Sequence, residues 1–305
     1  MVLKCEGPIR YVDYLPTEEL RASQQDPSVV VADIVDVDIV WGARSLRELV
    51  GEPVDYVLAS HVIEHVPDLI GWLLELHDVL RPGGTLGLAI PDRRFTFDLW
   101  RRESTLAEMV EAYLLRLRRP SVRQVFDAAS LAVPVDPAAA WRADLREGAP
   151  PSGKLAAAFG LARSLAEAPR HIDAHCWVFT PASFLDGVEA LLRLGVFPYT
   201  IAEFRPTEPG SLEFLVRLTA EDNPDAARAS LAAARVALAD ATPWPGEPAA
   251  LARANAALRE ALRVTRASTS WRITAPLRQL KRIAFRPGSR GHAGGRPGGS
   301  GAGET

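Results

Sequence analysis

The feature that most constrains the fold is a strand, a helix, a glycine turn and a second strand in direct succession. Val54–Ala59 is a short apolar run typical of a buried strand, and Pro67–Leu80 has leucines three or four residues apart, which predicts an amphipathic helix. Arg81–Gly84 (Arg-Pro-Gly-Gly) ends that helix, because proline cannot continue it and glycine permits a positive φ. Thr85–Ile90 predicts the second strand. This order implies parallel pairing and therefore an α/β fold.

Similar signals continue on both sides of this unit. Strands are expected at 9–12 and 29–32, and an antiparallel hairpin from strands at 199–205 and 212–218, joined by a turn that contains Pro209-Gly210. Helices are expected at 16–24, 105–118, 154–168 and 181–194, while 128–151 is rich in alanine and proline and predicts an irregular segment. The sequence therefore predicts a doubly wound, mostly parallel sheet with a C-terminal antiparallel hairpin in residues 1–220, with an insertion at 119–170.

The C-terminal quarter differs in character. Two Ala-rich helices are expected at 225–240 and 247–265, which would form a helical hairpin within residues 221–267. Residues 268–305 form a basic amphipathic segment followed by a tail rich in glycine, proline and serine, which predicts disorder. The appended helical region and the tail thus form two further parts of the chain.

Composition excludes several classes of protein. The apolar fraction is 48% and the net charge is −3, so the chain is neither wholly disordered nor a globally basic nucleic-acid binder. It has no run of 18 apolar residues and no apolar leader at its start, so we expect neither a transmembrane helix nor secretion. Two cysteines, Cys5 and Cys176, provide neither a disulfide framework nor a zinc pattern. We therefore expect a cytoplasmic location.

Polar residues follow the predicted strands, where ligands bind in open α/β sheets. Asp13 ends the first strand, and its carboxylate could accept both hydroxyls of a ribose. Asp33 and Asp36 follow the second strand, where a side chain could meet an adenine amine, and Ser60-His61 follow the third. Acidic residues are also common turn formers at strand ends, so each position taken alone has this second interpretation.

Two segments carry a resemblance to a known family: 60–68 (Ser-His-Val-Ile-Glu-His-Val-Pro-Asp) and 80–84 (Leu-Arg-Pro-Gly-Gly). Their order and spacing resemble those of class I S-adenosylmethionine-dependent methyltransferases of the type-11 group. The resemblance covers roughly residues 4–219. It implies a Rossmann-like fold, S-adenosylmethionine as cofactor and methyl transfer to a small molecule or glycan. Residues 92–98 and 175–181 also resemble a subgroup that occurs with glycosyltransferases in cell-surface polysaccharide pathways.

One element of that family is not found in this sequence. The family begins with a strand and a glycine-bearing loop that lies against the methionine part of the cofactor, whereas twelve residues precede Asp13 and Gly7-Pro8 is not such a loop. The resemblance places the missing strand between those that end at Asp13 and at Ser60. We expect the natural start to lie upstream. The alternatives are a substitute strand from Met1–Lys4 and a chain that does not bind the cofactor.

His61 and His65 are the candidate general bases, because histidine titrates near neutral pH and a hydroxyl acceptor must lose a proton. The alternative is that Glu64 serves a helix N-terminus and His65 packs in the core. His171 and His175 have a spacing that could bind a metal on a helix, but no further ligand pattern accompanies them, so no metal is expected.

Two other sets of charged residues have open interpretations. Asp92 and Asp98 flank a basic aromatic loop and could contact a sugar or a phosphate, or simply be solvated. Residues 268–278 resemble a motif at the ends of bacterial polysaccharide glycosyltransferases and their neighbours, which would suit a membrane surface or a glycosyltransferase partner. No nucleic-acid partner is expected. The alternative function is a non-catalytic adaptor that keeps the sheet and binds such a partner.

Overall fold

The computed structural model describes residues 7–24, 29–42, 44–142 and 152–241, together with Trp244 and Arg263. All of these except Arg263 belong to a compact unit, Met1–Gly246, and the remainder of the chain, Glu247–Thr305, forms a second unit. The alternative strand at Met1–Lys4, the expected helix at 247–265 and the basic segment and tail at 268–305 lie outside the described residues, apart from Arg263.

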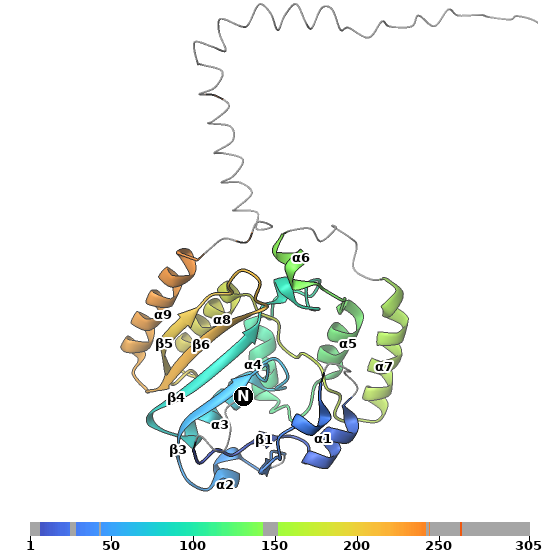
Figure 1. The fold of residues 1–305 in the computed structure, drawn as a ribbon, viewed down its shortest axis with the longest axis horizontal. Coiled ribbons are helices and arrows are strands. Elements are labelled where there is room, and N and C mark those ends of the chain that lie inside the picture. The colour runs from blue at the N-terminus through green and yellow to red at the C-terminus, as the bar shows by residue number, and fades with distance from the viewer. Residues whose placement is uncertain are drawn as a thin grey trace, which may run out of the picture. The chain divides into compact units, whose positions relative to one another are not determined.

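A four-stranded mixed sheet forms the centre of this unit, in the order β3 (Val54–Ser60), β4 (Leu80–Pro91), β6 (Glu213–Ala220) and β5 (Tyr199–Arg205). Strands β3 and β4 pair in parallel, while β6 pairs antiparallel with both β4 and β5. Figure 1 shows the four strands side by side. The predicted α/β class, the parallel pair and the C-terminal hairpin are confirmed.

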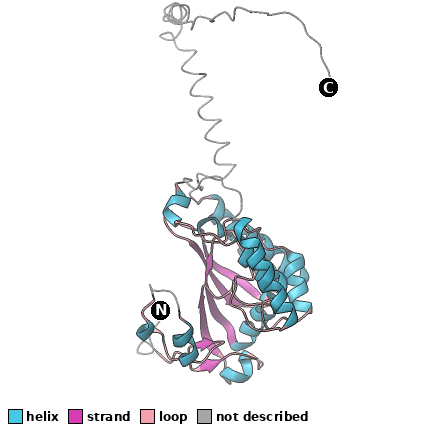
Figure 2. Ribbon diagram, turned by 90° about the vertical axis from the view of Figure 1, so that its right-hand side faces the viewer, coloured by secondary structure: helices cyan, strands magenta, loops and turns pink. Residues whose placement is uncertain are grey.

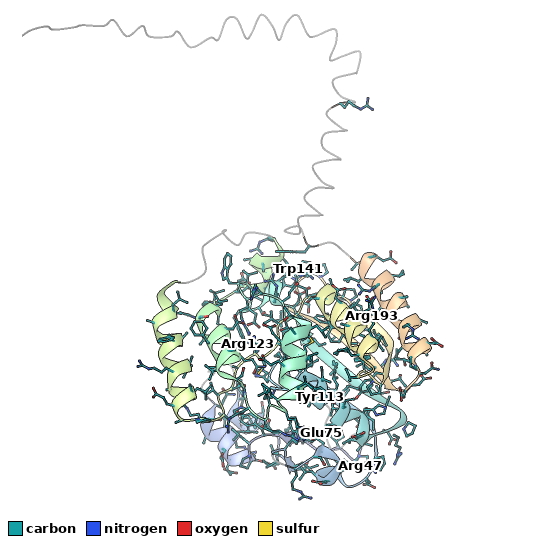
Figure 3. The ribbon with its side chains drawn as sticks, turned by 180° about the vertical axis from the view of Figure 1, so that it is seen from behind. Arg47, Glu75, Tyr113, Arg123, Trp141 and Arg193 are labelled. Atoms are coloured by element: carbon teal, nitrogen blue, oxygen red, sulfur yellow. The ribbon has the colours of Figure 1, made fainter. Side chains whose placement is uncertain are left out.

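One face of the sheet is buried under helices. Alternate residues of β4 point into the core, among them Leu86, Leu88 and Ile90, as the period of two of a strand requires. The core that they share includes residues of α3 (Leu69–Val79), α4 (Leu106–Leu114), α8 (Pro181–Leu194) and α9 (Pro224–Ala239). Figure 2 shows most of the helices gathered on one side of the sheet, and Figure 3 shows Glu75 and Tyr113 on that side.

Local sequence explains where these helices begin and end. Thr105 and Thr180 each form a capping box at the start of α4 and α8, and α8 also has Pro181 in its first turn. Gly195 ends α8 with a φ of 71°, a left-handed conformation that glycine adopts without strain. The helices predicted at 181–194 and 225–240, which are α8 and α9, are confirmed. The helix predicted at 105–118 is confirmed up to Leu114, where α4 ends.

The segment between α4 and α8 is more helical than expected. It contains α5 (Val122–Leu131), α6 (Pro137–Trp141) and α7 (Leu155–Glu167), with a short 3-10 turn η4 (Ser152–Lys154) before α7. A further 3-10 turn, η3 (Arg93–Phe95), lies between β4 and α4. The prediction of a helix at 154–168 is confirmed. The prediction of irregular structure across 128–151 is wrong for the end of α5 and for α6, because Asp136 caps α6 and Pro137 occupies its first turn.

The N-terminal part contains β1 (Val12–Asp13), α1 (Thr17–Ser23), η2 (Val31–Asp33), β2 (Ile39–Val40) and α2 (Leu46–Val50). The strand predicted at 29–32 is wrong, since this segment enters the 3-10 turn η2 and its valines are exposed. The second strand lies later in the chain, where Asp38 accepts a hydrogen bond from the Tyr11 N–H and Val12 pairs with Ile39.

Among the described residues, no strand joins the two sheets. Strand β1 pairs in parallel with β2, and β3 pairs with β4, so each sheet keeps a free edge. On the face of β3 away from the helices, Tyr56 and Leu58 are exposed, and so is Leu215 of β6.

Candidate functional site

The turn that follows β3 positions the histidine-rich segment. His61 adopts a φ of 53°, which is uncommon for a residue other than glycine, and its N–H donates to the Ala89 carbonyl of β4 at 3.0 Å. The chain then turns back toward α3, with a hydrogen bond from the His65 N–H to the Val62 carbonyl. The turn therefore places His61, Glu64 and His65 at the carboxyl end of β3.

A distant loop is fixed against this turn by backbone hydrogen bonds. The Glu64 carbonyl accepts from the N–H groups of Cys176 and Trp177, at 2.5 and 3.3 Å. The Trp177 indole donates to the Val66 carbonyl at 2.6 Å, and Trp177 is almost completely buried. These bonds bring His175 to the same place as the turn after β3, although more than one hundred residues separate them in the chain.

Three histidines surround the Glu64 side chain, which is 1% exposed. The Glu64 Oε1 lies 3.6 Å from His61 Nδ1, 3.8 Å from His65 Nε2 and 3.9 Å from His175 Nε2. All three separations exceed a normal hydrogen bond. Neither Glu64 carboxylate oxygen has a hydrogen-bond partner among the described residues.

A carboxylate lies on the other side of each histidine ring. Asp173 contacts His65 Nδ1 at 2.6 Å, Asp98 contacts His175 Nδ1 at 2.5 Å and Glu213 contacts His61 Nε2 at 2.5 Å. These contacts orient the rings, so that the second nitrogen of each ring lies nearest to Glu64.

Arg101 supports the deepest of these carboxylates. Arg101 and Asp98 are both nearly inaccessible to solvent, and their ion pair measures 2.8 Å. Arg101 also contacts Asp127 of α5 at 2.7 Å. A buried charge needs partners of this kind, and the network fixes Asp98 behind His175.

The ionisation of this cluster follows from its burial and contacts. Burial raises the pKa of Glu64, although the three histidines and its own backbone oppose the shift. Burial acts to lower the pKa of His65, but the hydrogen bond and charge of Asp173 outweigh it, and the pKa is raised. The pKa of Asp98 is lowered, because the contacts with His175 and Arg101 outweigh its burial. The cluster can therefore hold or exchange a proton.

The tip of β1 reaches the same neighbourhood. The Tyr14 ring stacks on His171, with ring centroids 4.4 Å apart, and the charge of Asp173 contributes, after burial, to a raised pKa of Tyr14. Asp13, next to Tyr14, is half-buried, and its Oδ1 accepts from the Leu15 N–H at 3.0 Å. The segment from His171 to His175 thus contacts both Tyr14, the residue after β1, and His65 in the turn after β3.

Asp33 and Asp36 do not lie where the sequence predicted. Both precede β2 instead of following a strand, because the segment at 29–32 is not a strand. Asp33 belongs to the 3-10 turn η2, and Asp36 is exposed and pairs with Arg21 of α1 at 2.9 Å. The residue that follows β2 is Trp41.

The other predicted polar residues have different environments. Ser60, at the end of β3, is exposed and lines a hollow of about 330 Å³ on the open face of the sheet, together with residues of β4, β5 and β6. Asp92 is fully buried and bonds to Thr207 and Arg94, so it is not a solvated loop charge. Asp98 is buried too and contacts His175, so neither aspartate is free to meet a sugar or a phosphate.

Sequence reasoning missed the partners of the histidines. It paired His175 with His171 on a helix, but this segment is not helical, and His175 instead faces His65 and Glu64. Asp173 lies between the two histidines in the sequence and was not considered. Glu213 lies next to the predicted hairpin turn, which gave no signal of a contact with His61.

Comparison with known proteins identifies the family of the chain. A family model described as a methyltransferase domain matches residues 14–189, which is more than half of the chain, and the chain belongs to this family. No curated protein and no solved structure matches the chain. Among the described residues, no helix is both long and apolar enough to cross a membrane.

Proposed function

We propose that the chain is a class I methyltransferase that uses S-adenosylmethionine to methylate an oxygen or nitrogen of a small molecule or glycan. The observation that carries the proposal is that the family match, residues 14–189, spans the turn at the carboxyl end of β3 and the His171–His175 segment, which contacts Tyr14 and His65. In parallel α/β sheets this edge is where ligands bind.

The described residues fit the nucleoside part of the cofactor better than the methionine part. Asp13 offers a half-buried carboxylate at the end of β1, which suits ribose hydroxyls. Residues 7–11, which precede β1, form no glycine-rich loop. We therefore assign Asp13 to the ribose, with Ser60 and His61 as further contacts, and no residue to the methionine part. S-adenosylmethionine, when bound, supplies an activated methyl group on a cationic sulfur.

His61 and His65 are the candidates for removing a proton from a hydroxyl acceptor. Each is about one-third exposed, so an acceptor can reach it, and each ring is oriented by a carboxylate. The hydrogen bond and charge of Asp173 outweigh burial and raise the pKa of His65, which stabilises its protonated form. A histidine in this environment accepts a proton from the acceptor oxygen and returns it to solvent after the methyl group has moved.

Calorimetric titration with S-adenosylhomocysteine tests the proposal. We expect saturable binding, and Asp13→Ala should weaken it by about tenfold or more, because hydrogen bonds to a charged group contribute roughly 1.5–3 kcal/mol. The matched control is Asp222→Ala, an exposed aspartate after β6, which should bind like the parent protein. Absence of binding by the parent chain, or equal binding by Asp13→Ala, would contradict the assignment.

A glycan acceptor within a surface-polysaccharide pathway is our proposal for the substrate class. Its support is the resemblance of residues 92–98 and 175–181 to a subgroup that occurs with glycosyltransferases. A glycosyltransferase partner, or a membrane surface that contacts the basic segment 268–305 from the cytoplasmic side, belongs to the same proposal. Methyl transfer from labelled cofactor to a panel of nucleotide sugars and oligosaccharides tests it, and labelling of unrelated small molecules alone would contradict it.

A second candidate function is a non-catalytic adaptor. It is favoured by the edges of β1 and β3, which have no partner strand among the described residues, and by the exposed apolar residues Tyr56, Leu58 and Leu215 on one face of the sheet. An adaptor would bind a partner protein without binding S-adenosylhomocysteine. The titration above therefore distinguishes the two functions.

A further inference from the structure

The group at the centre of the histidine cluster lacks what a buried carboxylate requires. Buried polar atoms are almost always hydrogen-bonded, yet both oxygens of Glu64 are without a partner among the described residues. The three nearest ring nitrogens point toward Glu64 but stop at 3.6 to 3.9 Å. These carboxylate and imidazole groups face one another but are too far apart to form hydrogen bonds. Such an arrangement is typical of a site that binds an ion between its ligand atoms.

We propose that Glu64, His65 and His175 bind a divalent transition-metal ion, for which Zn²⁺ is the model. One ligand atom from each residue lies within 4.8 Å of the other two. Ligands about 2.1 Å from a tetrahedral zinc ion lie about 3.4 Å apart, so a small inward shift of the side chains would complete the coordination. Two histidines and one carboxylate, with a position left for another ligand, are a common set for such ions.

The carboxylates behind the two rings support this assignment. Asp173 and Asp98 contact the Nδ1 atoms of His65 and His175, which makes Nδ1 the protonated nitrogen and leaves each Nε2 as a lone-pair donor toward Glu64. Metal-binding histidines are usually held in this way by a carboxylate on the other ring nitrogen. Asp98 is itself fixed by Arg101, so the His175 ring is held before any ion binds.

The elements that carry the ligands are also fixed. Glu64 and His65 lie in the turn after β3, and His175 lies in a segment bound to that turn through the Glu64 carbonyl. Glu64 and His175 are buried, whereas His65 is about one-third exposed, so the cluster opens to solvent on the His65 side. An incoming ligand would approach from that side.

His61 is the remaining group within reach. Its Nδ1 lies 3.6 Å from Glu64 Oε1, and its Nε2 contacts Glu213. If the methyltransferase function proposed above holds, His65 is a metal ligand and His61 becomes the base. A hydroxyl of the acceptor that coordinates the ion would lose its proton more readily, and His61 could accept that proton.

Titration of the full chain with Co²⁺ tests the site without cofactor or substrate. The protein is treated with a chelator and dialysed, and Co²⁺ binding is followed by visible absorption, with Zn²⁺ as competitor. We expect one equivalent of Co²⁺ to bind and Zn²⁺ to displace it. Glu64→Gln and His175→Ala should each bind at least tenfold more weakly, and Asp98→Asn should lose about 10- to 100-fold through its effect on His175.

Two matched variants serve as controls. His171→Ala removes a histidine four residues before His175 that stacks on Tyr14 instead of facing Glu64, and Cys176→Ser removes a buried thiol beside the cluster. Both should bind Co²⁺ like the parent chain, and circular dichroism should show every variant folded without metal. The proposal is overturned if the parent chain gives no saturable band. Unchanged binding by Glu64→Gln and His175→Ala, or an equal loss in either control, would also overturn it. None of these outcomes depends on S-adenosylhomocysteine binding, so the metal site and the proposed function can fail separately.

Discussion

The end of β3 and the N-terminal β1–β2 pair contribute to the same candidate site but are built differently. At the end of β3, Ile63, Val66 and Trp177 are almost completely buried around Glu64. In the N-terminal pair, the strands have two residues each and α1 buries none of its side chains. The proton-handling half of the site therefore belongs to the core, whereas the half assigned to the nucleoside is held by few contacts.

This difference predicts which substitutions destabilise the protein and which change only binding. Substitutions around Glu64 alter packing and buried charge, and both have large effects on the free energy of unfolding. Substitutions near β1 and β2 act through exposed contacts, which are small. The four predictions below test this contrast in order of decreasing expected effect.

The largest effect is expected for Trp177→Ala. Trp177 is 1% exposed, and its indole donates to the Val66 carbonyl, so its removal leaves a cavity and an unpaired carbonyl. We expect a loss of about 3–5 kcal/mol in the free energy of unfolding, measured by urea denaturation. Val30→Ala, at an exposed position in the N-terminal part, should change it by less than about 0.5 kcal/mol. Equal losses would remove the contrast between the two regions.

The next effect concerns Glu64 and depends on pH and on metal. Burial raises the pKa of Glu64, so between its unfolded and folded pKa values the folded state binds more protons and stability falls as the pH rises. In metal-free protein, Glu64→Gln should therefore be more stable than the parent at pH 7, by about 1–3 kcal/mol, because it removes a buried carboxylate that has no hydrogen-bond partner among the described residues. The gain should disappear near pH 3, where the parent carboxyl is protonated.

Thermal melts with and without Zn²⁺ measure this prediction. A gain of 1 kcal/mol raises the Tm by roughly 2–4 °C for a domain of this size. Excess Zn²⁺ should stabilise the parent chain and leave Glu64→Gln nearly unchanged, which reverses their order. A Glu64→Gln variant that melts below the metal-free parent at pH 7 would show that the carboxylate has a stabilising partner.

The same contrast explains what sequence could predict. Periodicity and caps gave the bounds of α8 within a residue and of β5 without error, because local signals and burial agree there. They failed at 29–32, where three valines favour a strand but remain exposed, and the pairing instead begins at Ile39. The β-propensity of these valines does not produce a strand, because β-propensity depends on packing against a neighbouring strand.

The candidate site was predictable in part for a related reason. His61, Glu64 and His65 are neighbours in the sequence, so one motif identified them. Their partners are brought to the site only by the tertiary fold and are Asp98, Asp173, His175 and Glu213. The largest separation in sequence is 152 residues, between His61 and Glu213. The spacing of His171 and His175 would suit a metal site on a helix, but this segment is not helical, and the Cys176 and Trp177 N–H groups bond to the Glu64 carbonyl.

The third prediction addresses the contact that joins the two regions. Tyr14 of the N-terminal part stacks on His171, beside the cluster. In a double-mutant cycle, Tyr14→Leu and His171→Ala should show a coupling energy of about 0.5–1.5 kcal/mol, the usual range for a pair of aromatic rings. Urea denaturation of the four proteins gives this value. A coupling energy near zero would mean that the stack does not hold β1 beside the end of β3.

The smallest effect is expected for Asp36→Ala, and it is informative because the sequence assigned Asp36 to the adenine. The structure places this carboxylate before β2, exposed to solvent and paired with Arg21. Exposed ion pairs contribute about 0–1 kcal/mol, so the free energy of unfolding should change by less than about 1 kcal/mol. Titration with S-adenosylhomocysteine should give the same affinity as the parent, in contrast to Asp13→Ala. A tenfold loss for Asp36→Ala would mean that the N-terminal pair rearranges when the nucleoside binds, which its few buried contacts would permit.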